Sequence, residues 1–415
     1  MAKKGEVKKR NVAIEFWRFF TAIAIVGFHV GWIIARSCND TTGYYMETSN
    51  WFFGSSEVLL LFTITAGYFM VAHFKKLAKE PKYKERSAAS RAFEYTWTRI
   101  KALLPVLILG YIMGVLFSTK FFYPDYGVKE TFAMLFNSIW EFLGFHSVGL
   151  RSVSGEFFNL NGPLWFISAI IIVGYFIYWG LCKNEDLTSG FVAPILAIFF
   201  AGWWSFTNTR AAQTAWSTFG SQLASTNGMG GSATSATATI GFNNGLIFVM
   251  LGMLIGVILY YAIEKLKEHD FKHKWALTIL NVFVSGLLIW YIIYQPTYFN
   301  LERWPVAFLC ILVVGLSLLN KDGLTKVLNN DTTNKVLAYL GSLSLYVYMI
   351  HYPVAILLLR CLGKNTPETI YSFWLIFIPT IIVSVVWSMA IKLVMDKTLL
   401  KKWFNHFFFF IFLIY

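Results

Sequence analysis

Charged residues are scarce in this chain of 415 residues: Asp, Glu, Lys and Arg together make up 14% of it. Hydrophobic residues make up 57% and aromatic residues 19%, whereas soluble domains carry about 25% charged residues. So few charges cannot cover the surface of a soluble protein of this size. The composition excludes an ordinary soluble domain and indicates an integral membrane protein.

Cysteine is also scarce, with four residues, Cys38, Cys182, Cys310 and Cys361. Their spacing matches no metal-ligand or redox motif, so we predict no zinc site and no other metal. Cys38 and Cys361 each follow an apolar stretch by a few residues and are expected just outside the membrane on its outer face, where a disulfide can persist. The sequence leaves two alternatives for this pair, two free thiols or one disulfide.

Ten apolar stretches predict ten membrane-spanning helices, because about 20 apolar residues suffice to cross a bilayer. They are residues 12–35, 51–73, 100–118, 163–181, 189–206, 241–262, 276–294, 304–320, 336–359 and 371–394. The predicted fold class is therefore an all-α integral membrane protein. We expect one ten-span domain over residues 1–398 and a short hydrophobic C-terminal tail over residues 399–415. No internal repeat indicates the inverted halves of a transporter.

Acidic residues are fewer than basic ones, 22 against 35, which gives a formal net charge of +13. An even number of spans places both termini on one side of the membrane, and 26 of the 35 basic residues fall on that side. The positive-inside rule makes it the cytoplasm. The positive charge is thus a topology signal, and we predict no nucleic-acid partner. The first span is too long, and carries charges too far inside it, to be a cleavable signal peptide.

The connections between spans have distinctive compositions. Between the second and third spans lies KKLAKEPKYKERSAASRAFEYTWTRIK, expected as an amphipathic segment on the inner membrane surface. One interpretation is a solvent-exposed run of charges that only fixes the membrane topology. The other is an anion-binding site, because Arg99 and Lys101 lead into the third span. The outer loop 119–162 is rich in aromatic residues, and the low-complexity loop 207–240 is either a flexible lid or disordered.

The first span, VAIEFWRFFTAIAIVGFHVGWII, carries Glu15, Arg18 and His29. At about 100° per residue, Arg18 and His29 lie within ~20° of one helix face, and Glu15 lies ~40° from His29. An arginine near the membrane centre costs roughly 2.5 to 3.5 kcal/mol on insertion scales, so this stripe indicates a functional site. A buried Glu15–Arg18 salt bridge that only holds helices together is the alternative.

Five segments in order carry a resemblance to the acyltransferase 3 family. They are Arg18 with His29 after ten further residues, LFTITAGYFM (Leu61 to Met70), TRIKALLP (Thr98 to Pro105), GPLWFISA (Gly162 to Ala169) and GSLSLYVYMIHYPV (Gly341 to Val354). Each resembles a family motif, and the resemblance that they carry together covers about the whole chain from Val12 to Lys397. Two positions depart from the pattern: Ala66 stands where serine is usual, and Glu57 where an apolar or small residue is more frequent. The chain resembles the single-domain members, without a C-terminal periplasmic domain.

This resemblance implies a membrane enzyme that moves acyl groups from coenzyme A donors onto sugars. Arg18 and His29 lie ~16 Å apart along their helix, at 1.5 Å per residue. That separation is comparable to the extended phosphopantetheine arm of coenzyme A. Arg18, with Arg99 and Lys101, would hold the phosphates at the cytoplasmic mouth while the thioester reaches His29.

The residues expected around His29 come from four spans. His29 would act as general base toward an acceptor hydroxyl, with an acyl-histidine intermediate as the alternative. Glu57 would orient its imidazole, unless that carboxylate is simply solvated. Asn161, Trp165 and His351 are expected to contact substrate. The alternative for Trp165 is an interface anchor, and for His351 a helix-packing hydrogen bond.

The sequence therefore predicts an O-acyltransferase in the plasma membrane of a bacterium. Its partners would be the lipid bilayer, acyl-coenzyme A and a cell-surface or exported glycan. Acetyl-coenzyme A is the expected donor, with succinyl or another short acyl group as the alternative. A second class of function, a secondary transporter or glycan flippase, would use the same polar stripe as a substrate or proton pathway. A purely structural scaffold is disfavoured by the stripe, and the sequence does not indicate an oligomeric state.

Overall fold

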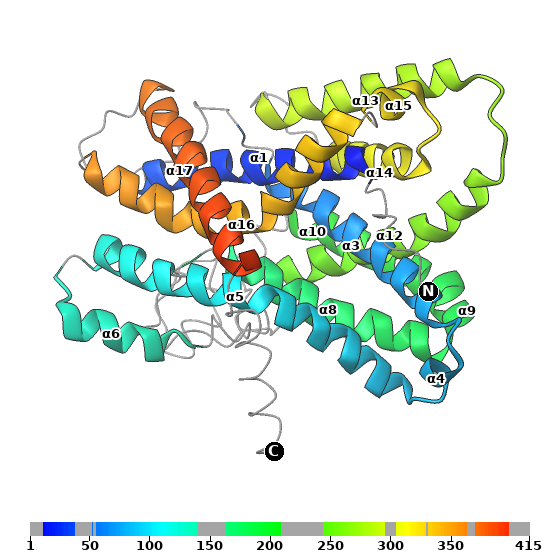
Figure 1. The fold of residues 1–415 in the computed structure, drawn as a ribbon, viewed down its shortest axis with the longest axis horizontal. Helices are drawn as coiled ribbons and strands as arrows, with labels where there is room; N and C mark the ends of the chain where they lie inside the picture. Colours follow the sequence, from blue (N-terminus) through cyan, green and yellow to red (C-terminus); the bar gives the residue numbers. More distant parts are fainter. Residues whose placement is uncertain are drawn as a thin grey trace.

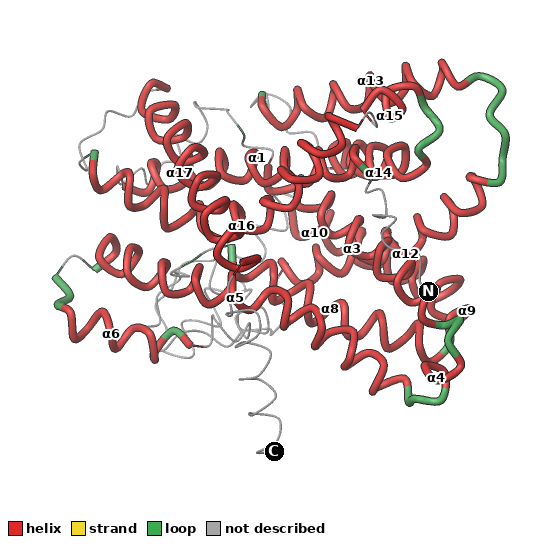
Figure 2. Tube along the Cα trace, in the orientation of Figure 1, coloured by secondary structure: helices red, strands yellow, loops and turns green. Residues whose placement is uncertain are grey.

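The computed structural model describes residues 11–37, 52, 55–123, 125–139, 161, 163–208, 244–294, 304–328, 331–362 and 370–397. Over these ranges the chain is helical and contains no strand (Figure 2). The all-α fold class expected from the sequence is therefore confirmed. The C-terminal tail expected at 399–415 lies outside the described residues.

Every one of the ten predicted spans corresponds to a helix (Figure 1). The ten are α1 (Val12–Ser37), α3 (Ser55–Leu77), α5 (Ala88–Phe122), α8 (Leu164–Lys183), α10 (Ala193–Asn208), α12 (Asn244–Lys267), α13 (Lys274–Ile293), α14 (Trp304–Leu319), α16 (Asp331–Cys361) and α17 (Ile370–Lys397). Within the described ranges nine helices are long and apolar enough to cross a membrane, and α14 is shorter, with 16 residues. Short helices α4 (Pro81–Lys84), α6 (Val128–Asn137), α9 (Glu185–Leu187) and α15 (Gly323–Leu328), with a π-helical turn η2 (Thr188–Val192), complete the order.

The basic segment between the second and third spans differs from the sequence expectation. Rather than one separate segment, it forms the last turn of α3, then α4, and then the first turns of α5, which is 35 residues long. The Ser87 side chain accepts a hydrogen bond from the backbone N–H of Ser90 and caps this start. Arg99 consequently lies ~17 Å along a continuous helix, rather than at its entry.

The aromatic loop 119–162 also differs from a simple outer loop. Helix α6 turns back beside α5, where the Tyr111 hydroxyl lies 2.5 Å from the Leu135 carbonyl oxygen and 2.9 Å from Ser138 Oγ. Asn161, just before α8, donates to the carbonyl oxygen of Gly110 at 2.9 Å. Both described parts of this segment therefore contact α5 near Gly110 and Tyr111. This point lies about three turns, or ~18 Å, before the end of α5 at Phe122. Helix α8 begins at that depth.

Helices α3 and α12 make a close crossing through glycines. A Cβ atom on Gly67 would collide with the backbone of Met253, and one on Gly256 with the backbone of Ile64. Gly252 likewise leaves room for the Thr63 side chain. Gly252 and Gly256 are four residues apart on α12, the small-residue spacing that lets two membrane helices approach. This crossing fixes α3, which carries one wall of the cavity described below.

Helices α1 and α16 lie side by side and run in the same direction (Figure 1). Glu15 touches Gly341 near their starts, and His29 touches His351 further along. The shared direction agrees with the sequence expectation, in which both are odd-numbered spans. Parallel packing keeps the polar stripe of α1 against α16 along its length.

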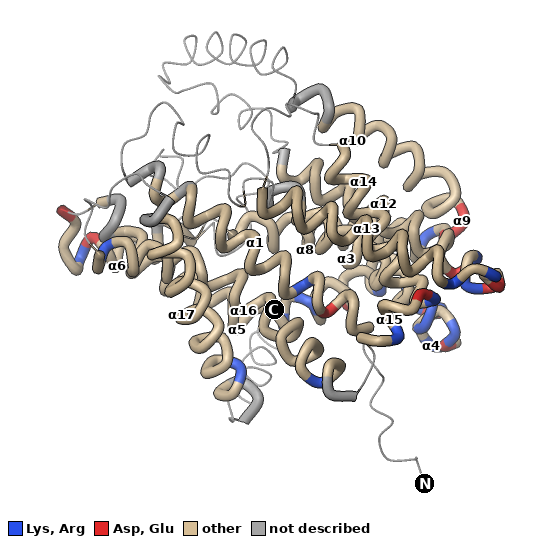
Figure 3. The backbone as a smooth tube through the Cα atoms, turned by 90° about the horizontal axis from the view of Figure 1, so that it is seen from above, with Lys and Arg blue, Asp and Glu red and all other residues tan. Residues whose placement is uncertain are grey.

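Charged residues gather at the ends of the helices. Figure 3 shows a group of them where α4, α9 and α15 lie and another at α6, on the opposite side of the view. At the first end Lys75 of α3 pairs with Glu185 of α9, which also accepts a 2.8 Å hydrogen bond from the Tyr261 hydroxyl of α12. These contacts tie three helices together at this end of the molecule.

Candidate functional site

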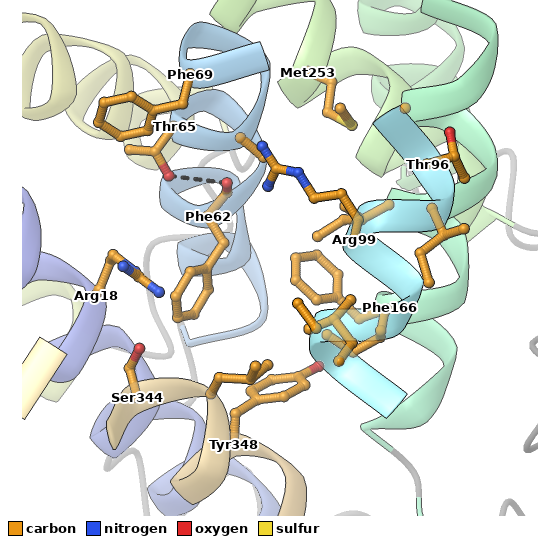
Figure 4. A pocket seen from close by; sticks show the side chains of 18 of the residues that line it. Arg18, Phe62, Thr65, Phe69, Thr96, Arg99, Phe166, Met253, Ser344 and Tyr348 are labelled. Atoms are coloured by element: carbon orange, nitrogen blue, oxygen red, sulfur yellow. Dashed lines mark hydrogen bonds between the residues drawn. The ribbon is translucent and has the colours of Figure 1, made fainter. Parts of the chain in front are cut away.

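A cavity of about 330 Å³ lies among α1, α3, α5, α8, α12 and α16 (Figure 4). Its walls are mostly apolar, with a few hydroxyl groups and two guanidinium groups. The lining residues are Arg18, Phe62, Thr65, Ala66, Phe69, Tyr95, Thr96, Arg99, Ala102, Leu103, Phe166, Ile167, Ile170, Ile171, Gly174, Met253, Ser344, Leu345 and Tyr348. The arrangement suits a long ligand with an anionic end and an uncharged remainder.

The two guanidinium groups come from different helices, Arg18 from α1 and Arg99 from α5 (Figure 4). Arg18 lies 3.4 Å from the Glu15 carboxylate, and its side chain is 36% exposed. Arg99 lies over the ring of Tyr95, 4.8 Å from its centroid. No acidic residue is among the lining residues in the described part of the chain. Two guanidinium groups therefore line the cavity, one of them paired with a carboxylate, and guanidinium groups bind phosphate in a bidentate fork.

The structure does not bring Lys101 to this cavity. Lys101 is exposed on α5 and is absent from the cavity lining. Residues two apart on a helix point ~160° away from one another, so Arg99 and Lys101 face opposite sides of α5. Of the three cations expected to hold phosphate, Arg18 and Arg99 share one cavity.

Three aromatic rings close the inner end of the cavity. Phe62 of α3, Phe166 of α8 and Tyr348 of α16 have ring centroids 5.8 to 6.3 Å apart. The Tyr348 hydroxyl donates to the carbonyl oxygen of Pro163 at 3.2 Å, which holds this ring in place. Phe166 and Tyr348 are 2% and 3% exposed, whereas Phe62 is only partly buried.

His29 and His351 lie next to this aromatic closure and outside the cavity lining. Nδ1 of His29 is 2.9 Å from Nε2 of His351, and the His351 side chain is fully buried. The rings of Tyr348 and His351 have centroids 6.0 Å apart. Tyr348 therefore lines the cavity and lies next to the histidine pair.

Asn161 lies at the same depth but contacts backbone. Its amide nitrogen donates to the carbonyl oxygens of Gly110 and Met349, both at 2.9 Å, so it joins α5 to α16 at the start of α8. Its side-chain oxygen is buried and has no partner among the described residues. The geometry gives Asn161 a structural role and leaves its buried side-chain oxygen without a partner among the described residues.

Trp165 is placed away from the cavity lining. Its ring fills the space beside Gly245 of α12 and meets Phe166 edge-on, with centroids 5.6 Å apart. The contact it makes with the site is therefore indirect, through Phe166.

Two other sequence expectations fall on residues that the structure does not fully describe. Glu57 lies in the first turn of α3, and its side chain is outside the described residues. Cys361 is a free, exposed thiol at the end of α16, while Cys38 is outside the described residues. In the described part of the chain no three His, Cys, Asp or Glu residues gather as a metal site.

The aromatic closure is the part of the site that the sequence did not single out. Phe62 and Tyr348 lie inside the segments LFTITAGYFM and GSLSLYVYMIHYPV, and Tyr348 precedes His351 by one helical turn. That spacing could have pointed to Tyr348. No sequence feature distinguishes Phe62, because it is one of 40 phenylalanines in the chain.

Comparison with known proteins agrees with this architecture. We find no match to the chain among curated proteins or among solved structures. A family model described as an acyltransferase domain, Acyl_transf_3, matches residues 11–393. This match includes every helix that lines the cavity and both histidines beyond it. The chain therefore belongs to the acyltransferase 3 family and is a multi-pass membrane acyltransferase.

Proposed function

We propose that this protein transfers an acyl group, acetyl foremost, from cytoplasmic acyl-coenzyme A to a hydroxyl of a cell-surface or exported glycan. The observation that carries the proposal is the order of groups along one path. Two guanidinium groups line the cavity, three aromatic rings close it, and a histidine pair follows. An acyl thioester with a phosphate-bearing carrier has its parts in the same order.

The donor would enter from the end of the molecule where the basic residues gather. Both termini would then be cytoplasmic, in the plasma membrane of a bacterium. Arg18 and Arg99 would hold the coenzyme A phosphates, and the ~16 Å between Arg18 and His29 along α1 suits the phosphopantetheine arm. The carrier stays at the cytoplasmic mouth while only the acyl group advances.

The chemistry would centre on His29. Its imidazole takes the proton of the acceptor hydroxyl while that oxygen attacks the thioester carbonyl carbon. Collapse of the tetrahedral intermediate breaks the C–S bond, and the imidazolium returns the proton to the departing thiolate. The products are the acylated glycan and coenzyme A. A two-step route through acyl-His29 uses the same groups and remains the alternative.

The three rings would set the size of the acyl group. A thioester that reaches His29 must pass or displace one ring, and Phe62 is the least buried of the three. Phe166 and Tyr348 are held by the surrounding helices. Phe62 is thus the side chain expected to move during transfer, and its bulk favours a short acyl chain.

We expect Phe62→Ala to shift donor preference toward longer acyl chains. Truncation removes part of the closure, so hexanoyl transfer should rise relative to acetyl transfer by about 10-fold, the scale of one or two methylene contacts. The measurement is kcat/KM for acetyl-, butyryl- and hexanoyl-coenzyme A. Phe69→Ala is the matched control, because Phe69 lines the same cavity from α3, two turns away. An unchanged ratio in Phe62→Ala would rule out this ring as the size filter.

The proposed function is tested by comparing surface glycans of a deletion strain with those of its parent by mass spectrometry. We expect an acyl increment, 42 Da for acetyl, to disappear in the deletion strain and to return with the intact gene. Glycans of identical mass in the two strains would refute the proposal.

A further inference from the structure

We propose that His351 is a positioning residue, which fixes the tautomer of His29 so that Nε2 of His29 is the basic nitrogen. This inference rests on the proposed function only in its catalytic consequence. The tautomer itself follows from hydrogen bonds among the described residues. It differs from the substrate-binding role expected from the sequence.

The first step concerns His351 alone. Its Nδ1 lies 3.1 Å from the carbonyl oxygen of Val347, one turn earlier on α16. A carbonyl oxygen only accepts hydrogen bonds, so Nδ1 of His351 carries the proton. In a neutral imidazole the other nitrogen, Nε2, is then an acceptor.

The second step carries this assignment across to α1. Nδ1 of His29 is 2.9 Å from Nε2 of His351, and two acceptors cannot hydrogen-bond each other. Nδ1 of His29 must therefore donate, which leaves the lone pair of His29 on Nε2. The chain of donors runs from His29 to His351 to Val347, and the His29 ring also hydrogen-bonds the backbone of Ile25, one turn earlier on α1.

Neutral rings fit this environment. His351 is fully buried, and among the described residues no carboxylate contacts either ring. A buried imidazolium without a partner is costly. The neighbouring Tyr352 ring meets His29 edge-on, with centroids 5.6 Å apart, and restricts its rotation.

The consequence for catalysis is directional. In the opposite tautomer the lone pair of His29 would sit on Nδ1 and point at His351, where no hydroxyl can reach it. In Ser-His-Asp enzymes, loss of the group that fixes the histidine tautomer lowers kcat by about 10⁴. The group that accepts the hydrogen bond here, His351, is neutral rather than a carboxylate. We therefore expect its removal to lower kcat by less, about 10- to 100-fold.

Two substitutions separate this role from packing. His351→Phe keeps an aromatic ring and removes the acceptor, whereas His351→Gln offers an amide oxygen near the position of Nε2. We expect His351→Phe to lower kcat by about 10- to 100-fold with an unchanged KM for acyl-coenzyme A, and His351→Gln to recover much of that loss. Met349→Leu, a buried change on the same helix, should keep wild-type kcat.

A second readout does not depend on activity. In protein labelled with ¹⁵N-histidine, the His29 signals, assigned by their loss in His29→Asn, should show a protonated Nδ1 and an unprotonated Nε2. In His351→Gln this tautomer should persist, and in His351→Phe the two tautomers should mix. A protonated Nε2 of His29 in the wild type, or wild-type kcat in His351→Phe, would overturn the inference. The spectrum gives this answer even if the protein transfers no acyl group.

Discussion

His29→Ala is expected to lower acyl transfer by at least about 10²-fold while the protein remains folded. The imidazole is the proposed proton acceptor, and a general base contributes typically 10²- to 10⁴-fold in rate. His29 is only partly buried, so truncation leaves a small gap and removes the hydrogen bond to Nε2 of His351. The measurement is steady-state release of the free coenzyme A thiol in the presence of acceptor.

Two controls separate this loss from damage to the fold. The thermal unfolding midpoint in detergent should match the wild type within a few degrees. His269→Ala, which removes an exposed histidine between α12 and α13, should transfer acyl groups at the wild-type rate. Wild-type transfer by His29→Ala would remove the proposed mechanism.

Arg18→Lys and Arg99→Ala should each weaken donor binding by about 10-fold or more. Hydrogen bonds to charged groups contribute ≈ 1.5–3 kcal/mol, and each 1.4 kcal/mol is a factor of 10 in affinity. Lysine is chosen at position 18 because it keeps a positive charge beside the buried Glu15 while losing the guanidinium fork. Calorimetric titration with acetyl-coenzyme A gives the dissociation constant for each variant.

Lys101→Ala is the matched control for Arg99→Ala. It removes a cation two residues away on the opposite face of α5, outside the cavity, and should leave donor affinity unchanged. A second donor, acetyl-pantetheine without phosphates, should bind equally to the wild type and to both arginine variants. Equal affinity of all variants for acetyl-coenzyme A would show that these arginines do not hold its phosphates.

The membrane helices could be predicted because burial in lipid leaves a composition signal along the chain. The ten apolar stretches each became a helix, and parallel packing of α1 with α16 agrees with their odd span numbers. The start of α5 could not be placed, since its basic first turns resemble a surface segment. The return of α6 beside α5 was missed because its ten residues are too few for a span.

The candidate site was predictable only along individual helices. The spacing of Arg18 and His29 placed both on one face of α1, and the motif near the end of the chain contained His351. Lateral packing has no signature in a single sequence, so the contact between the two histidines had to come from the structure. Lys101 is a neighbour of Arg99 in sequence, but it lies on the opposite side of α5 and outside the cavity lining.

Sealed inside-out vesicles containing the protein and trapped acceptor glycan test the central claim, that an acyl group crosses the membrane between Arg18 and His29. Labelled acetyl-coenzyme A is added outside, at the face that was cytoplasmic. We predict that only acceptor trapped in the lumen becomes acylated, that free coenzyme A appears outside, and that no carrier accumulates within. A transporter would instead concentrate an unmodified solute without consuming thioester. Acylation solely of acceptor supplied on the same face as the donor would contradict the through-membrane account.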